Sequence, residues 1–115
     1  MNEEIKTIFE TPLVIGEKTI PVAHLRYRGN SKKFVTWSML QEVPFFSAND
    51  ELLYTKCSVD FDVYADGDYS AISDEIKTRM KTNGWTWIED SVEMFEEDTN
   101  LFHRTITFEK EKYNG

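Results

Sequence analysis

The stretch Lys56–Trp85, KCSVDFDVYADGDYSAISDEIKTRMKTNGW, decides the fold of this chain. Its first ten residues alternate between two kinds of side chain. The odd-numbered residues are small or apolar: Cys57, Val59, Phe61, Val63 and Ala65. The even-numbered residues are mostly polar: Lys56, Ser58, Asp60, Asp62 and Tyr64. A period of two over ten residues predicts a β-strand with one buried face.

The second half of the same stretch changes to helical spacing. After the turn Ala65–Asp68, large apolar residues recur at Tyr69, Ile72, Ile76 and Met80, and Asn83–Gly84 follows. Asn-Gly is typical of the left-handed residue that ends a helix. We therefore expect a strand, a tight turn and an amphipathic helix that lies across one face of a sheet.

The segments before this stretch are predicted as one helix, a connector and two strands. The helix covers Asn2–Glu10, and the connector Leu13–Pro21 contains a turn at Gly16–Lys18. The strands, Val22–Arg28 and Phe34–Gln41, are expected to form a hairpin with a basic tip at Arg28–Lys33. An irregular segment, Glu42–Glu51, follows, because Pro44 disfavours a central strand and Ser47–Asp50 is typical of a loop.

The C-terminal part is predicted as a second hairpin, with arms Trp85–Phe95 and Leu101–Glu111 and an acidic loop, Glu96–Asn100. These elements together predict an α+β fold for residues 1–115 as a single domain. We expect a two-layer sandwich in which two helices cover one face of a mostly antiparallel sheet of about four to five strands. The other face would carry Asp60, Asp62 and Tyr64.

Composition limits the class of function. The formal net charge of −8 argues against nucleic acid or an anionic membrane as the main partner. The sequence has no apolar run near the roughly 18 residues of a membrane span, and the acidic start Met1–Glu4 is unlike a signal peptide. Cys57 is the only cysteine, so no internal disulfide can form, and we expect folding in a reducing cytoplasm.

The charge is unevenly distributed along the chain. Residues 1–40 contain six Lys and Arg against four acids, whereas residues 41–115 contain seven against seventeen. One interpretation is an ordinary solvated surface. The other is a molecule with a basic end and an acidic flank that docks onto copies of itself. For that contact the candidates are four cations of the predicted hairpin, Arg26 in its first strand and Arg28, Lys32 and Lys33 at its tip.

A second interface candidate is apolar and consists of Val43, Pro44, Phe45 and Phe46. Adjacent phenylalanines in an extended segment point in opposite directions, so one of them would be exposed. Exposed apolar patches of this kind mark protein contacts. The alternative is that the segment folds over the edge of the core. The rings of Trp85 and Trp87 are assigned mostly to the core.

The sequence contains no convincing catalytic, cofactor or metal site. The run Asp60–Asp68 contains four aspartates, but a calcium loop started at Asp62 would place Tyr64 third and Ser73 twelfth, where acids are needed. His24 and His103 lack ligand partners at zinc spacing, and Cys57 belongs to the apolar face of its strand. The acids from Glu89 to Asp98 are interpreted as a solvated tip. We therefore expect a non-enzyme that needs no cofactor.

The order of elements resembles the tail completion or tail terminator proteins of long-tailed bacteriophages, the group that includes tail-to-head joining proteins. The resemblance covers nearly the whole chain. The segments that carry it are Leu25–Gly29, Phe34–Trp37, Pro44–Glu51, Val59–Tyr64, Gly67–Tyr69 and Phe95–His103, followed by the strand that ends at Phe108–Glu109.

This resemblance implies a structural role. Proteins of this kind form a six-membered ring that caps the finished tail tube, stops its polymerisation and offers a surface to the head connector. The expected partners are therefore other copies of the chain, the tail tube protein and the head connector or neck protein. The expected location is the virion tail of a phage or prophage, assembled in the cytoplasm of the bacterial host.

Two other functions stay open. An acidic, inhibitor-like module would bind a cationic partner and remain a monomer. A small hydrolase that uses the acids near Asp60 and Asp66 would need a concave pocket with two convergent carboxylates, one with a raised pKa.

Overall fold

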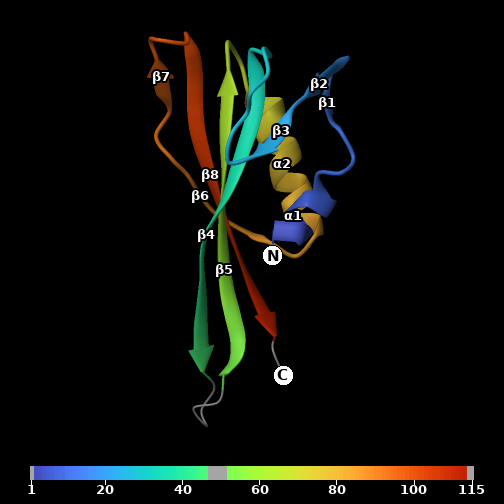
Figure 1. The fold of residues 1–115 in the computed structure, drawn as a ribbon, viewed down its shortest axis with the longest axis vertical. Coiled ribbons are helices and arrows are strands. Elements are labelled where there is room, and N and C mark those ends of the chain that lie inside the picture. Colours follow the sequence, from blue (N-terminus) through green and yellow to red (C-terminus); the bar gives the residue numbers. More distant parts are fainter. Residues whose placement is uncertain (1, 47–51, 114–115) are drawn as a thin grey trace.

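A computed structural model describes residues 2–46 and 52–113. Its elements follow the chain in the order α1 (Asn2–Ile8), β1 (Leu13–Ile15), β2 (Lys18–Ile20), β3 (Val22–His24), β4 (Lys33–Phe46), β5 (Leu52–Ala65), α2 (Ser70–Thr82), β6 (Thr86–Asp90), β7 (Met94–Glu96) and β8 (Leu101–Tyr113) (Figure 1). Neither helix in these ranges is long and apolar enough to cross a membrane.

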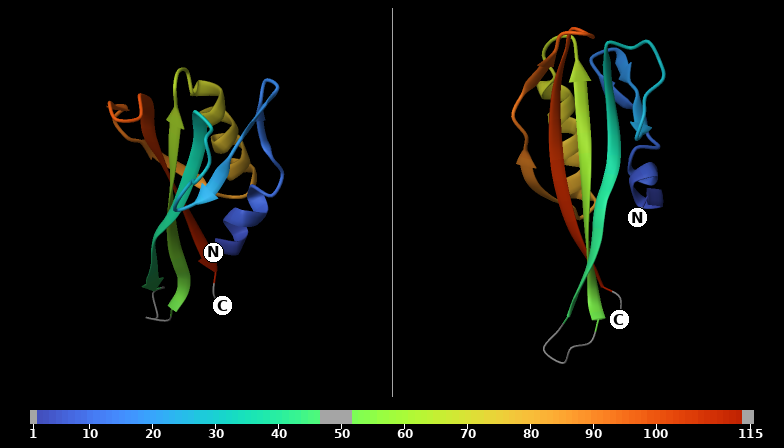
Figure 2. Two further views of the ribbon diagram at one scale, coloured as in Figure 1. Left: turned by 45° about the horizontal axis from the view of Figure 1, so that its top comes forward. Right: turned by 60° about the vertical axis from the view of Figure 1, so that its left-hand side comes forward.

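Six strands form the main sheet, in the order β3-β4-β5-β8-β6. β7 pairs with β8 beyond the end of β6, so β6 and β7 share one edge of the sheet. All pairs are antiparallel except β3 and β4, and both helices lie on the same face (Figures 1 and 2). The predicted α+β fold is confirmed, with an open sheet of five to six strands.

The core lies between the sheet and the two helices. The alternation predicted for β5 is confirmed, because Cys57, Val59, Phe61, Val63 and Ala65 are all fully buried. The helices meet this face with four buried side chains, Ile5, Ile72, Ile76 and Met80. The apolar stripe of each helix is buried on the sheet because no other apolar surface is available to it.

The predicted start and end of the second helix are also confirmed. At its start, the Asp68 carboxylate accepts a hydrogen bond of 2.9 Å from the Ser70 backbone N–H. At its end, Gly84 has a φ of +87°, and the Trp85 N–H donates to the Met80 carbonyl at 2.9 Å. A left-handed glycine lets the chain leave the helix without steric cost and enter β6.

The predicted hairpin between Val22–Arg28 and Phe34–Gln41 is wrong. β3 ends at His24 and pairs with β4 in parallel. Leu25 donates its N–H to the Trp37 carbonyl at 2.9 Å and then adopts a φ of +66°, which turns the chain away from the sheet. Arg28–Lys33 therefore belongs to a connection between parallel strands and to the start of β4, and forms no hairpin tip.

The expected connector Leu13–Pro21 forms a small hairpin, β1–β2, in which Leu13 is paired with Ile20 and both are buried. The turn predicted at Gly16–Lys18 is confirmed in position, and Gly16 has a φ of +65°. A three-residue strand on each side is too short to give a clear period-two pattern, so this hairpin was not predicted.

The predicted irregular segment Glu42–Glu51 is also corrected, because β4 continues to Phe46 and pairs with β5 throughout. β3 reaches only Val35–Trp37, so Pro44 lies where β4 has a neighbour on one side only, a position that tolerates proline. The loop predicted at Ser47–Asp50 lies outside the described residues. The end of β4, the start of β5 and the end of β8 extend together beyond the helices, and we call this projection the arm (Figure 1). The molecule measures 52 × 28 × 22 Å.

Candidate functional site

The connection Leu25–Lys32, called the basic loop here, carries three of the four cations proposed for an interface. Arg26, Arg28 and Lys32 are exposed, and none of them forms an ion pair with a residue that the structure describes. Lys33 differs, because its ammonium group is paired with the Asp66 carboxylate at the end of β5. The structure thus leaves three of these cations exposed and without an ion pair among the described residues, and pairs the fourth within the domain.

Ring stacking fixes the basic loop to the open face of the sheet. Tyr27 stacks on Phe34 with 4.4 Å between ring centroids, and its hydroxyl accepts a 2.8 Å hydrogen bond from the Ser31 N–H. The stack continues across the sheet from Phe34 to Tyr64 and from Tyr64 to His103, with centroid separations of 4.7 and 4.2 Å. The loop therefore presents its cations from a fixed base.

Replacing Gly29 with alanine is expected to distort the basic loop. A Cβ atom at this position would overlap the phenol ring of Tyr27, which cannot move freely because it stacks on Phe34. We expect a loss of stability of about 1–3 kcal/mol, typical of overpacking, measured by urea denaturation. Gly67→Ala is the matched control, because no atom lies near its added methyl group. A Gly29 variant as stable as that control would contradict the stacked loop.

The opposite edge of the sheet is acidic. We use the name acidic edge for residues 86–98, which include β6 and β7. This segment contains six acids and no Lys or Arg. Three of the acids have partners in the fold: Asp90 pairs with Lys77 at 3.0 Å, Glu93 accepts from the Tyr69 hydroxyl, and Glu96 contacts His103 at 3.2 Å. The other three, Glu89, Glu97 and Asp98, make no ion pair with a described residue.

Large apolar side chains are exposed along the same edge. Trp87 is 52% exposed, Val92 80% and Phe95 50%, and Ile88 and Met94 are also exposed. The assignment of Trp87 to the core is therefore corrected, while Trp85 is buried. β6 is an edge strand, and Trp87 and Ile88 are both exposed although successive strand residues face opposite sides of a sheet. The sequence did not reveal this exposure, because position at a sheet edge is a property of the tertiary structure.

The second interface candidate, Val43–Phe46, lies at the end of β4 in the arm. Val43 is 39% exposed and Pro44 is exposed, both within β4. The exposure predicted for the Phe45 and Phe46 rings lies outside what the structure describes. The arm and the acidic edge are thus separate surfaces, one at the far end of β4 and the other along β6 and β7 (Figure 1).

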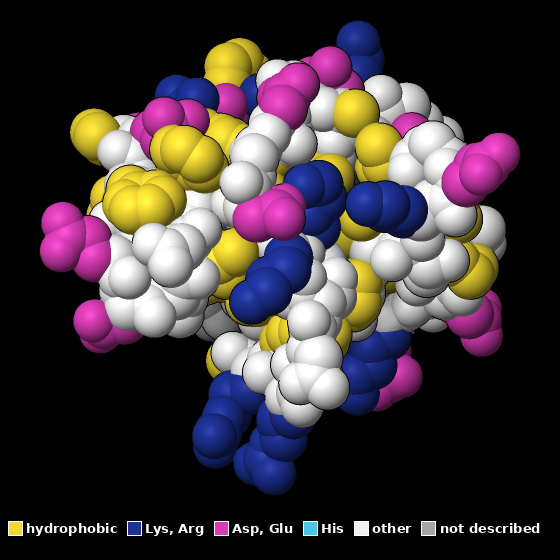
Figure 3. Space-filling model, turned by 90° about the horizontal axis from the view of Figure 1, so that it is seen from above, with side chains coloured by type: hydrophobic (Ala, Val, Ile, Leu, Met, Phe, Trp, Pro, Cys, Tyr) yellow, Lys and Arg dark blue, Asp and Glu magenta, His cyan; other side chains and the backbone are white. Residues whose placement is uncertain are grey.

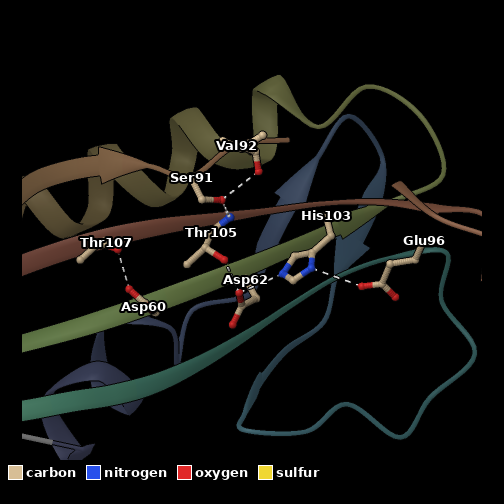
Figure 4. Close-up of polar contacts among 8 residues, drawn as sticks. All are labelled: Asp60, Asp62, Ser91, Val92, Glu96, His103, Thr105 and Thr107. Atoms are coloured by element: carbon tan, nitrogen blue, oxygen red, sulfur yellow. Dashed lines mark hydrogen bonds and ion pairs between the residues drawn. The ribbon is translucent and has the colours of Figure 1, made fainter. Parts of the chain in front are cut away.

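The open face of the sheet carries a row of paired polar groups (Figure 4). The Asp62 carboxylate accepts from the Thr105 hydroxyl at 2.6 Å and contacts the His103 ring at 2.9 Å. The Thr107 hydroxyl donates to Asp60, also at 2.6 Å. His103 therefore lies between Asp62 and Glu96, a neighbourhood that its sequence position did not reveal because the strands come from distant parts of the chain.

Asp60 and Asp66 are expected to affect stability in opposite directions with pH. Burial raises the pKa of Asp60 despite the Thr107 hydrogen bond, so its ionisation opposes folding above the pKa of the unfolded chain. The hydrogen bond from Lys33 lowers the pKa of Asp66, so ionised Asp66 supports folding. At pH 7, Asp60→Asn should raise the denaturation midpoint and Asp66→Asn should lower it. The Asp60 difference should shrink as the pH falls toward about 4, through the raised pKa, and the Asp66 difference should shrink only as the pH falls below about 4. Differences that persist at still lower pH would contradict these assignments.

The pair of acids required by the hydrolase hypothesis is not brought together. Asp60 and Asp66 lie six residues apart on and just after β5, which corresponds to about 20 Å along an extended strand. A cavity of about 520 Å³ lies elsewhere, beside the start of α2. Part of its charged lining is paired, through Lys77 with Asp90 and Tyr69 with Glu93, and Arg104 donates to the Ser91 carbonyl at 2.8 Å. Asp68 accepts from Ser70, and Asp74 is exposed on the same cavity.

The other candidate reactive groups are enclosed or dispersed. Cys57 is fully buried, and burial raises the pKa of its thiol. Among the residues that the structure describes, no three His, Cys, Asp or Glu side chains are arranged to hold a metal ion. The basic loop, the acidic edge and the projecting arm are three separate regions of the surface of this α+β domain (Figure 1).

No protein-family model matches the chain, and no curated protein has a matching sequence.

Proposed function

We propose that this protein is a structural component of the tail of a long-tailed bacteriophage or prophage. In this proposal, copies of the chain form a ring on the end of the tail tube. The ring stops polymerisation of the tube protein and provides the docking surface for the head connector. It assembles in the bacterial cytoplasm and remains in the virion tail.

The observation that carries the proposal is the opposite charge of the two edges of the sheet. Residues 13–33 carry five Lys and Arg and one acid, whereas residues 86–100 carry six acids and no base. These segments lie on opposite flanks of the molecule (Figures 1 and 2). A subunit with two different, complementary flanks associates head to tail, and such association closes into a ring when the rotation per subunit fits a full turn.

The arm supports the second part of the proposal, contact with the tail tube. It extends the longest axis of the molecule to 52 Å and points away from both charged edges (Figure 1). Its exposed apolar groups include Val43 and Tyr113. A projection that lies outside the plane of subunit contacts can reach a different protein, and apolar exposure is typical of such contacts.

The experiment that tests the proposal measures mass and tube capping together. The purified protein is analysed by light scattering over a range of concentrations, alone and with tail tubes from the phage or prophage that encodes it, and tube ends are viewed by electron microscopy. A ring of about six copies, in solution or on tube ends, is the expected result. A protein that leaves tube ends bare under all conditions would rule out the capping role.

The acidic edge also favours a second candidate, the monomeric inhibitor-like module. Exposed Trp87 and Phe95 beside unpaired carboxylates would suit a basic site on a different protein. This candidate gives the opposite result in the same experiment, because the chain would remain a monomer with and without tubes. It also leaves the three unpaired cations of the basic loop without a role.

A further inference from the structure

We infer that the acidic edge of one copy docks on the basic loop of the next copy. This inference rests on the proposed ring and goes further, because it names the two surfaces that meet and the partner of each. The arm and the open face of the sheet remain outside this contact.

The charges on the two surfaces match in number. Three cations of the basic loop, Arg26, Arg28 and Lys32, have no ion pair in the described part of the chain. Three acids of the acidic edge, Glu89, Glu97 and Asp98, are unpaired in the same sense. The remaining acids of that edge already have partners within the domain. The fold therefore leaves three cations of the basic loop and three acids of the acidic edge without an ion pair among the described residues.

Apolar groups accompany the charges on both sides. The acidic edge exposes Trp87, Val92 and Phe95. On the other flank, Leu25 is 62% exposed and Val14 51% exposed. The β1–β2 hairpin that carries Val14 adjoins the basic loop, because Thr19, Ser31 and Lys32 line one cavity. An apolar centre with a charged rim is the usual composition of a specific protein interface.

The arrangement of the two surfaces favours a second copy as the occupant. Seen from the end of the molecule, Lys and Arg gather through the centre and lower margin, while the left side carries hydrophobic groups flanked by Asp and Glu (Figure 3). Among the described residues, no ion pair joins a cation of the basic loop to an acid of the acidic edge. A contact between unlike patches on opposite flanks is heterologous, and it uses both patches of every copy once a ring closes.

Two charge-reversal variants test this contact. The loop variant carries Arg26→Glu, Arg28→Glu and Lys32→Glu, and the edge variant carries Glu89→Lys, Glu97→Lys and Asp98→Lys. A control reverses two exposed charges of the N-terminal segment, Lys6→Glu and Glu10→Lys, which lie outside the basic loop, the acidic edge and the arm. Circular dichroism confirms that each variant is folded before its assembly is measured.

Each variant alone should associate at least about 10-fold more weakly than wild type, because like charges would face each other at every contact. An equimolar mixture of the two should assemble again, since each altered surface meets an opposite charge on the other variant. The control should assemble as wild type does. Light scattering measures the mass, with rings on tube ends counted by electron microscopy where tubes are required for assembly. A mixture that assembles no better than its components, or a control equally weakened, would overturn the inference.

The same measurements separate this inference from the proposed function. Rings that respond to the mixture as expected but never cap tubes would refute the capping role and leave the inferred contact intact. Capped tubes without recovery in the mixture would refute the contact alone. A wild-type chain that stays monomeric with and without tubes would contradict both.

Discussion

Replacing Phe61 with alanine is expected to lower the free energy of unfolding by about 3–5 kcal/mol. Phe61 is fully buried in β5, between the helical layer and the last strand. Its ring lies 5.2 Å from that of Phe9 and 5.7 Å, edge-on, from that of Phe108. Removing it would leave a cavity where three separate parts of the chain meet, and neighbouring side chains would fill it incompletely. Urea denaturation followed by circular dichroism measures the change.

Phe95→Ala is the matched control for this prediction. Phe95 is half exposed and touches one other ring, that of Phe102. Its removal should cost the isolated domain about 1 kcal/mol or less, as is usual for partly exposed sites. If the inferred contact is correct, the same change should weaken self-association. Equal losses of stability at Phe61 and Phe95 would show that the core is not centred on β5.

Replacing Ile76 with aspartate is expected to lower the free energy of unfolding at neutral pH by about 4 kcal/mol or more, at least as much as Phe61→Ala does. Ile76 is fully buried in the middle of α2, where its side chain joins the helix to the sheet. A carboxylate there would lose its hydration without gaining a cationic partner. Since small domains are stable by only about 5–15 kcal/mol, most of the chain could unfold.

The pH dependence identifies the cause of that loss. Burial would raise the pKa of the introduced carboxyl above its value in the unfolded chain. The full penalty would therefore apply above the raised pKa and would decline as the pH falls toward about 4. Thr78→Asp, at an exposed position on the same helix, is the control and should change stability by about 0.5 kcal/mol or less. A deficit at Ile76 that does not depend on pH would point to lost packing alone.

The elements that were predicted correctly have strong local patterns. The ten alternating residues of β5 form a pattern long enough for burial of one face to dictate the secondary structure, and so do Tyr69 and the three apolar residues of α2 that follow it at helical spacing. Asn83–Gly84 marked the end of α2 because a left-handed residue there is a local requirement. The C-terminal hairpin was predicted in outline for the same kind of reason, from two apolar arms around a polar turn. Its first arm, predicted as continuous over Trp85–Phe95, is divided into β6 and β7 by residues 91–93.

The errors fall where neighbours in space override local signals. Pro44 argued against a strand, but a proline is tolerated in β4 because β3 is too short to reach it. Arg26 and Arg28 were placed in a strand and at a hairpin tip, whereas the hydrogen bond from Leu25 to Trp37 ends β3 and creates a loop. Trp87 resembled a core residue because edge position in a sheet leaves no trace in the composition of a strand.

The fold class, the buried face of β5, the limits of α2 and the overall excess of acid could all be predicted from the sequence, since each depends on residue type and local spacing. Which charges remain unpaired depends on contacts between distant parts of the chain. Lys33 meets Asp66, and His103 meets Asp62 and Glu96, because the sheet brings together residues far apart in the chain. The candidate site consists of the charges of the basic loop and the acidic edge that remain unpaired in the fold. It could therefore be identified only once the strands were placed side by side.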